Sequence, residues 1–206
     1  MKITYYITVC DEEEELKRLL EAIVPKLMED EIIIQYDVTR VTDNVKIVID
    51  SFIEKHQNIR SYGYPLNNHF AEFKNKIFDY SPTGDYIIQI DADELPSDLF
   101  INYIKNVLVV NDVIDIFAIP RRNKVIGITP EHLKKWNWKM DEFGWINGED
   151  YQWRILKNNG KIKWINKVHE KLSNYKTYSY LPPKMYFNHI KTIEKQESQN
   201  NYYSNL

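Results

Sequence analysis

The sequence Asp91-Ala92-Asp93-Glu94 places two carboxylates two residues apart, directly after an apolar run. That run, Asp85–Ile90, is nearly continuous in apolar residues, which is typical of a strand buried on both faces of a sheet. Neighbouring anions beside a buried strand repel each other, and a divalent cation is the simplest group that offsets this cost. Mg²⁺ and Mn²⁺ prefer oxygen ligands, commonly one or two carboxylates plus substrate phosphates. The spacing favours a metal site over acids that only neighbour the positive N-terminus of the next helix.

A second group of acids, Glu149 and Asp150, stands just before the apolar segment Tyr151–Leu156. Such residues form either a polar turn before a strand or a positioned carboxylate that accepts a proton, and the residues alone do not decide between the two. Gln152 and Arg154 alternate along the predicted strand and share one face. Arg154 is therefore placed to orient Asp150.

Aromatic residues are unusually frequent, with 15 Tyr, 8 Phe and 5 Trp in 206 residues. Core packing is the default interpretation, but Trp136, Trp138, Phe143 and Trp145 lie among charged and polar residues. Some of these rings are expected to be exposed and to stack on the apolar face of a sugar. Trp145 is the first candidate for such a contact with an acceptor.

Strands and helices alternate over the first two-thirds of the chain, which predicts an α/β fold with a mostly parallel sheet and right-handed crossovers. Hydrophobic periodicity predicts strands over Lys2–Cys10, Glu31–Tyr36, Asn58–Tyr62, Asp85–Ile90 and Val113–Ile119, and helices over Glu12–Val24, 43–53, Asn68–Tyr80 and 97–110. Asp11 is the expected cap of the first helix, and Asp43 or Asn44 of the second. In open α/β sheets ligands bind beyond the carboxyl ends of the strands, where Asp91 and Asp93 lie.

The last third of the sequence has weaker periodicity. Arg121–Pro130 is predicted to be a loop, with Thr129 capping a short helix that begins at Pro130. Tyr151–Leu156 and Lys161–Ile165 are predicted to pair as a β-hairpin, because Asn-Gly lies between them. We expect one domain over residues 1–190, followed by a polar tail or helix over 191–206.

Composition excludes several classes of protein. Lys and Arg total 27 against 30 Asp and Glu, a net charge of -3, which does not support a broad nucleic-acid-binding surface. The single Cys10 excludes an internal disulfide framework, and no apolar run approaches the length of a spanning helix. The apolar start is followed at once by acids, unlike a signal peptide. We therefore expect a protein without a transmembrane segment, located in the cytoplasm, or in the host cytoplasm if it is viral.

Four segments, Ile7–Leu20, Tyr86–Pro96, Gly148–Ile155 and Lys167–Leu172, together resemble glycosyltransferase family 2. More narrowly, they are similar to the branch that contains lipopolysaccharide-core glucosyltransferases and related phage glycosyltransferases. The resemblance implies a GT-A fold, Rossmann-like with a C-terminal β-hairpin. It also implies transfer of a sugar from a nucleotide diphosphate donor with inversion, with Mn²⁺ or Mg²⁺ held by the DxD motif.

The resemblance implies roles for individual residues. The donor pocket would be lined by Thr8, Val9, Asp11, Asp37, Lys74, Asp91, Ala92 and Arg154. Asp37 would read the uracil ring and Lys74 would contact a phosphate. Asp93 would be the direct metal ligand, with Asp91 beside it and His169 or His189 as a third ligand. Asp150 would be the catalytic base, Glu149 would orient an acceptor hydroxyl, and Glu170 would be a rival base in the acceptor region.

The sequence thus predicts a metal-dependent inverting glycosyltransferase that moves a sugar, with a UDP-linked donor expected, to a hydroxyl of a glycan, lipopolysaccharide-like or protein-linked acceptor. A haloacid-dehalogenase-like phosphatase also places DxD after a buried strand, but Leu95 stands where that family has Thr or Val. A non-catalytic protein that binds nucleotide sugars or carbohydrates is a third possibility, which the intact Asp91, Asp93 and Asp150 argue against. The sugar, the linkage and the oligomeric state are left open.

Overall fold

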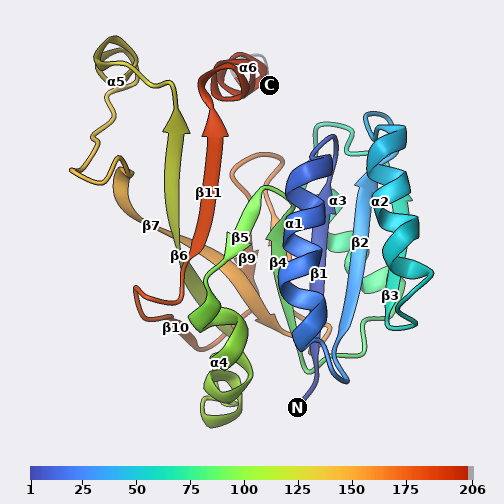
Figure 1. The fold of residues 1–206 in the computed structure, drawn as a ribbon. Helices are drawn as coiled ribbons and strands as arrows, with labels where there is room; N and C mark the ends of the chain where they lie inside the picture. Colours follow the sequence, from blue (N-terminus) through green and yellow to red (C-terminus); the bar gives the residue numbers. More distant parts are fainter. Residues whose placement is uncertain (204–206) are drawn as a thin grey trace.

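A curled mixed sheet runs through the whole molecule (Figure 1). The computed structural model describes the backbone of residues 1–203, with the side chains of the same range except those of residues 149, 202 and 203. The strands of the main sheet follow the order β3-β2-β1-β4-β7-β6-β11-β5, and β10 pairs with β6. A separate two-stranded hairpin joins β8 to β9. The fold is of the α/β class, as predicted.

The first half of the sheet is parallel. It contains β1 (Ile3–Val9), β2 (Glu31–Asp37), β3 (Ile59–Tyr64) and β4 (Tyr86–Asp91). β1, β2 and β4 are rich in Ile and Tyr and are almost wholly buried, because helices cover both faces. β3, at the edge of the sheet, is only partly buried. The carboxyl ends of these parallel strands meet at one edge, so Thr8, Asp37 and Asp91 are brought together.

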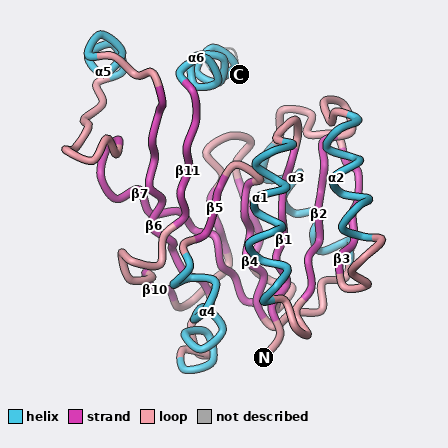
Figure 2. The backbone as a smooth tube through the Cα atoms, in the orientation of Figure 1, coloured by secondary structure: helices cyan, strands magenta, loops and turns pink. Residues whose placement is uncertain are grey.

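The helices form two layers, one on each side of this parallel half (Figure 2). One core joins the sheet to α1 (Glu13–Ile23), α2 (Asp43–Ile53) and α4 (Asp98–Val110). The other joins the opposite sheet face to α3 (Phe70–Asn75), the 3₁₀ turn Lys76–Tyr80 and the hairpin of β8 (Lys163–Ile165) and β9 (Lys171–Ser173). Successive side chains of a strand point to opposite faces of the sheet. Tyr5 and Ile7 of β1 therefore lie in the first core, and Tyr6 lies in the second.

The second half of the sheet is of mixed direction. β7 (Ile146–Lys157) lies antiparallel between β4 and β6 (Ile116–Ile126), and β11 (Phe187–Thr192) lies parallel to β6. The short strands β5 (Glu94–Pro96) and β10 (Tyr178–Tyr180) pair with β11 and β6. Beyond the ends of β6 and β11 stand two polar helices, α5 (Pro130–Trp136) and α6 (Ile193–Tyr203) (Figure 1).

Two predictions about this half are wrong. Residues 121–126, expected to be a loop, continue β6, because the strand is hydrogen-bonded to β7 on one side and to β11 on the other. A C-terminal hairpin exists, but its strands are β8 and β9: residues 151–156 belong to β7, which pairs with β4 and β6. The expected boundary at residue 190 falls within β11, and residues 193–203 form the expected polar helix.

The helix caps are partly as expected. Ser97 and Thr129 cap α4 and α5 through their hydroxyl groups. Asp11 does not cap α1; Glu12 is the N-cap residue, and its carboxylate instead accepts from the Cys10 and Asp11 backbone amides. Thr42, one residue earlier than expected, caps α2 by accepting from the Val45 amide. Among the described residues, no helix has the length and apolar character needed to cross a membrane.

Candidate active site

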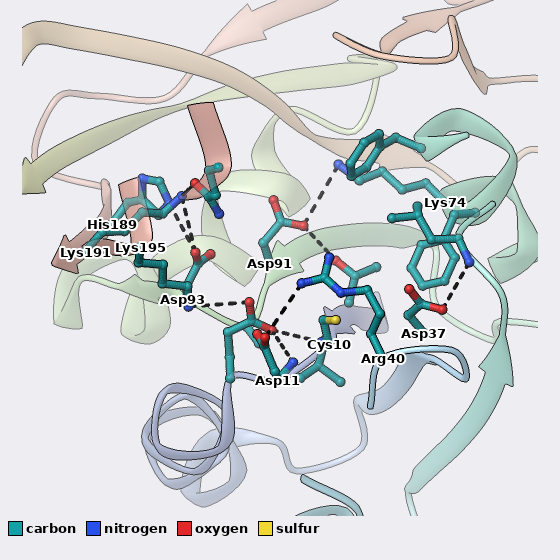
Figure 3. Close-up of a pocket in the computed structure, with 18 of the residues that line it drawn as sticks. Cys10, Asp11, Asp37, Arg40, Lys74, Asp91, Asp93, His189, Lys191 and Lys195 are labelled. Carbon is teal, nitrogen blue, oxygen red and sulfur yellow. Dashed lines mark hydrogen bonds and ion pairs between the residues drawn. The ribbon is translucent and has the colours of Figure 1, made fainter. Parts of the chain in front are cut away.

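A cleft of about 650 Å³ opens at the carboxyl ends of β1, β2 and β4 (Figure 3). The structure places twelve of the residues named from the sequence on its wall: Thr8, Val9, Asp11, Asp37, Lys74, Asp91, Ala92, Asp93, Arg154, His169, Glu170 and His189. Asp150 and Trp145 are not part of this wall. The side chain of Glu149 lies outside the described residues.

Asp91, at the end of β4, is bound on both carboxylate oxygens. Oδ1 accepts from the Thr8 hydroxyl at 2.6 Å and from Gln89 Nε2 at 2.8 Å, and Oδ2 accepts from Arg154 Nη2 at 2.6 Å. Burial opposes ionisation, but the charges of Arg154 and Lys74 outweigh it and hold the pKa of Asp91 well below its usual value. Asp91 is therefore an anchored anion.

Arg154 is shared with Glu94, which is only 1% exposed. Glu94 Oε1 accepts from Arg154 Nη2 at 2.6 Å and from Arg121 Nη1 at 3.3 Å. Arg121 in turn donates to Asp150 Oδ2 through Nε at 3.0 Å and Nη2 at 2.7 Å. These five residues form a continuous chain of alternating charges from Asp91 to Asp150, which we call the charge chain.

Asp150 lies at the far end of the charge chain, on β7. Besides Arg121, Asn123 Nδ2 donates to Oδ2 at 3.1 Å and Gln152 Nε2 donates to Oδ1 at 2.6 Å. Burial raises the pKa of Asp150, but the charge and hydrogen bonds of Arg121 outweigh it, so the pKa lies below the ordinary value. The carboxylate is therefore ionised at neutral pH.

Asp93 lies on the other side of the cleft from Lys74 and contacts the strand β11 (Figure 3). Asp93 Oδ2 is 3.3 Å from His189 Nε2 and 3.5 Å from Lys191 Nζ. Asn123 Oδ1 lies 2.7 Å from His189 Nδ1 and orients the imidazole. Burial raises the pKa of Asp93, but the hydrogen bond to His189 lowers it by more, so the pKa of the carboxyl lies below its usual value.

The donor set at Asp93 fits a divalent cation. Two ligands at right angles around Mg²⁺ or Mn²⁺ lie about 3 Å apart, close to the 3.3 Å between Asp93 Oδ2 and His189 Nε2. The expected trio of Asp91, Asp93 and His169 is not assembled: no group of three His, Cys, Asp or Glu side chains converges on one metal position within the described part of the chain. Asp91 is instead committed to Arg154, so His189, the alternative third ligand, is the better-placed partner of Asp93.

Asp37 occupies the opposite end of the cleft. Its Oδ1 accepts from the Thr39 amide at 3.0 Å, from the Thr39 hydroxyl at 2.8 Å and from the Leu66 amide at 3.3 Å. Arg40 and Asp11 form an ion pair at 3.7 Å across the same end. This region offers fixed polar groups to a planar, hydrogen-bonding ring.

Lys74 and Glu170 form a direct hydrogen-bonded ion pair inside the cleft. Lys74 Nζ is also 4.0 Å from Asp91 Oδ1, so it joins the two acids. Burial raises the pKa of Glu170, but the charge and the hydrogen bond of Lys74 outweigh burial, so the pKa of the carboxyl lies below its usual value. Its neighbour His169 has a positive φ of 52° and lies on the cleft wall near Glu170.

Trp145 lines a second hollow of about 420 Å³, which we call the side hollow. Its wall is formed by Pro120, Arg121, Arg122, Asp141, Phe143, Trp145, Gly148 and Pro183. Arg121 lines both the cleft and the side hollow. Along β7, Gly148 lines the side hollow and Gln152 lines the cleft, with Asp150 between them. The other two tryptophans of the sequence cluster pack together: Trp136, the last residue of α5, and Trp138, just beyond that helix, have 4.9 Å between ring centroids.

Several cleft residues were not found from the sequence. Arg121 was assigned to a loop, and Arg40, Lys191 and Lys195 carried no motif. Lys195 on α6 lies 3.5 Å from Glu12 and 3.8 Å from Glu15, so α6 is fastened beside the cleft. The spacing of His189, Lys191 and Lys195 does not distinguish them from residues of a solvated surface. Only the pairing of β11 with β6 does so.

Comparisons with known proteins identify the family and the fold. The chain from residue 4 to residue 185 matches the family model described as glycosyl transferase family 2. No curated protein sequence matches at a significant level. Among solved structures, TarS 1–349 of S. aureus in complex with UDP-GlcNAc aligns with a TM-score of 0.61 at 14% identity, over 93% of this chain and 59% of that one.

Another solved structure is glucosyl-3-phosphoglycerate synthase from Mycobacterium tuberculosis with Mn²⁺, UDP and phosphoglyceric acid, at a TM-score of 0.45 and 18% identity over 61% of this chain and 44% of that one. The chain thus spans about three-fifths of the length of the TarS structure and less of the second. The fold is that of the GT-A glycosyltransferases, and the chain belongs to glycosyl transferase family 2.

Proposed function

We propose that this glycosyltransferase is a metal-dependent inverting enzyme that transfers a sugar from a UDP-linked donor to a hydroxyl group of a carbohydrate acceptor. The observation that carries the proposal is the position of two acids on the cleft wall: Asp91 is the last residue of the central strand β4, and Asp93 lies just beyond it. His189 lies 3.3 Å from Asp93. The donor class is supported by the UDP-GlcNAc complex of the structurally similar TarS. A cytoplasmic location and the absence of a nucleic-acid partner remain predictions.

We assign each part of the donor to a position along the cleft. Uracil is placed near Asp37 and Arg40, where Thr39 and Leu66 fix the Asp37 carboxylate. The diphosphate is placed between Lys74 on one side and Lys191 and Lys195 on the other, all of which line the cleft. Three cations offset the charge of a diphosphate in a space that is partly shielded from water.

Asp93 and His189 are the residues that would hold Mn²⁺ or Mg²⁺, with the diphosphate completing the coordination shell. The mixed carboxylate and imidazole donors suit Mn²⁺ better than Mg²⁺. Bound there, the ion would stabilise negative charge on the departing nucleotide diphosphate. Asn123 orients His189, a supporting contact of the kind that fixes a ligand tautomer.

Asp150 is assigned as the base that takes the proton of the acceptor hydroxyl. It is joined to Arg121, which lines both the cleft and the side hollow, so an acceptor in the side hollow would meet a donor sugar near Asp150. Glu170 is the rival, because it lines the cleft directly. No observation favours the phosphatase alternative: both oxygens of Asp91, its would-be nucleophile, are already bound by Arg154, Thr8 and Gln89.

A thermal-shift experiment with UDP and Mn²⁺ tests the proposal. A ligand at about 100 times its Kd stabilises a protein by about 2.7 kcal/mol, which corresponds to about 5–10 °C for a chain of this size. We expect that shift for the unmodified protein only when both compounds are present, and its loss in Asp93→Ala.

Asp43→Ala is the matched control, because Asp43 is 97% exposed on α2 and lies outside the cleft wall. It should keep the full shift. Retention of the full metal-dependent shift by Asp93→Ala would refute the metal assignment, and no shift with any uridine or guanosine diphosphate sugar would refute the donor class.

A further inference from the structure

Two cations beside the side hollow have no acidic partner in the part of the chain whose side chains the structure describes. Arg122 and Lys124, on β6, form no ion pair and no side-chain hydrogen bond with any other described residue. Both are half-buried. Arg121, one residue away, is by contrast engaged by Glu94 and Asp150. Unpaired positive charge that is partly withdrawn from water is costly unless a ligand supplies the counter-charge.

Aromatic rings hold these two cations in place. The Arg122 guanidinium lies 3.7 Å from the centroid of the Tyr186 ring and 5.9 Å from that of Trp145, and Lys124 Nζ lies 5.6 Å from the Trp145 centroid. A guanidinium stacked on a ring keeps its edge N–H groups free for a planar anion. The Trp145 ring is therefore accompanied by cations, and a sugar that contacts it comes within reach of both.

Asp141, an acid on the wall of the hollow, makes no ion pair with either cation among the described residues. Asp141 Oδ1 accepts from the Phe143 amide at 3.0 Å and from the Trp145 amide at 2.8 Å, so it fixes the loop that carries the two rings. Asp150 is neutralised by Arg121 at the inner end of the hollow. Asp141 keeps its own negative charge, but Arg122 and Lys124 together outweigh it, so the described groups beside the hollow carry a net positive charge.

We infer that the side hollow binds an anionic acceptor: a sugar that carries a phosphate or carboxylate group, with the anion on Arg122 and Lys124 and the sugar ring against Trp145. This inference rests on the proposed function and adds the chemical class of the acceptor. The anion is a recognition group, and the reacting hydroxyl is a separate group that points toward Asp150. Charge-assisted hydrogen bonds to a guanidinium are about twice as strong as neutral ones, so the anion would dominate acceptor selection.

The test compares three probes, glucose, glucose 6-phosphate and glucuronate, by calorimetric titration and by the NMR shift of the Trp145 indole, assigned with Trp145→Phe. Saturating UDP and Mg²⁺ are present throughout, because the lysines of the donor cleft would otherwise bind the same anions. We expect at least one of the two anionic sugars to bind about tenfold more tightly than glucose, equivalent to about 1.4 kcal/mol, and to shift the Trp145 resonance. The anion that does so identifies phosphate, carboxylate or both as the recognised group.

Arg122→Gln should bring the anionic sugars to within about threefold of glucose, and Arg122→Lys should retain part of the preference. Lys135→Gln is the matched control, because Lys135 also lies 6.0 Å from a tryptophan centroid, that of Trp136, but outside the hollow. If Arg122→Gln does not fold, Lys124→Gln takes its place with the same expected direction. Equal binding of the three sugars, no measurable binding of either anion, or an unchanged preference in the variant overturns the inference.

The same samples separate this inference from the proposed function. Binding of UDP is measured by thermal shift before the sugars are added. If UDP binds and the anion preference is absent, only the acceptor class is wrong. If UDP does not bind while anionic sugars still shift the Trp145 resonance, the donor assignment fails and the anion site stands.

Discussion

The charge chain of Asp91, Arg154, Glu94, Arg121 and Asp150 connects the floor of the cleft to the side hollow through direct contacts between side chains. Arg154 and Glu94 are 6% and 1% exposed, so their charges are stabilised by each other and hardly by water. Removing one partner of a buried pair costs about 3–5 kcal/mol, because the other charge is left without compensation. We therefore expect the charge chain to be the part of the site where substitutions destabilise the protein most.

Glu94→Gln is expected to destabilise the protein by about 3 kcal/mol, because Arg154 and Arg121 lose the charge between them. The measurement is the free energy of unfolding in urea. Glu54→Gln, at an exposed position after α2, should change that free energy by no more than about 0.5 kcal/mol. Equal stability of the two variants would show that the arginines find other partners.

Asp150→Asn should lower kcat at least about 100-fold while the KM for the donor changes little, because the variant cannot accept a proton but keeps its place beside Arg121. Glu170→Gln should lower kcat less than about tenfold, since Glu170 is held by Lys74 on the donor side. Steady-state kinetics with donor and acceptor varied separately distinguish the two. The opposite order of effects would assign the base role to Glu170.

At the scale of elements, a single carboxylate ties four segments together at the end of the sheet opposite to the cleft. Glu31, at the start of β2, accepts from Thr4 of β1, from the Thr83 hydroxyl before β4 at 2.8 Å and from Arg60 of β3 at 2.8 Å. Gly84 follows Thr83, and a Cβ there would lie 2.4 Å from the Thr4 backbone nitrogen, so the loop can approach β1 only with glycine.

The stability of the sheet should therefore depend on pH through Glu31. Burial raises its pKa, but hydrogen bonds from the Thr83 backbone, Thr4, Thr83 and Arg60 outweigh burial, so the folded-state pKa lies below the ordinary value of 4.5. A lowered pKa gives stability that is fully present above the unfolded-state pKa and is lost as the pH falls through the folded-state pKa. We expect urea unfolding free energies to decrease below about pH 4.5.

Glu31→Gln should remove part of that dependence, and its unfolding free energy should converge with that of the unmodified protein at the acidic end. Glu54→Gln should follow the unmodified curve. A variant with the same slope as the unmodified protein between neutral and acidic pH would show that other carboxylates carry the effect.

At the scale of the molecule, the cleft is closed by the segment farthest along the chain. Lys191 of β11 and Lys195 of α6 line it opposite to residues of β1, and Lys195 pairs with Glu12 and Glu15. His132 of α5 lies 3.5 Å from Glu197 of α6, so the two polar helices also meet. Donor binding would join the two ends of the described chain.

Lys195→Ala is expected to weaken binding of UDP about three- to tenfold and to leave binding of uridine nearly unchanged, because Lys195 is placed near the diphosphate and not near the base. Titration calorimetry with both ligands measures the difference. Lys46→Ala, an exposed lysine on α2, serves as the control and should bind both ligands normally. Equal losses for UDP and uridine would place Lys195 in a purely structural role.

The parallel half of the fold, the family and most of the acidic residues of the cleft wall could be predicted from the residues alone. The buried residues of β4 form a continuous apolar run, and those of α1 recur at helical spacing, so each element can be recognised from neighbouring residues alone. Asp91 and Asp93 stand where β4 ends. The trio of Asp91, Asp93 and His169 as metal ligands was not assembled, and the individual roles of the other site residues remain predictions.

Only the tertiary structure decided the other half. The sequence around Arg121, Arg122 and Lys124 is typical of a solvated loop, because the partners that hold these half-buried side chains in a strand come from distant parts of the chain. Those partners are Glu94 and Asp150 for Arg121, and aromatic rings for Arg122 and Lys124. Their positions depend on β7 lying antiparallel between β4 and β6 and on β11 lying beside β6. Pairings between segments so far apart in the chain leave no periodic trace, which is why the link from Asp150 through Arg121 to Glu94 became visible only in the folded molecule.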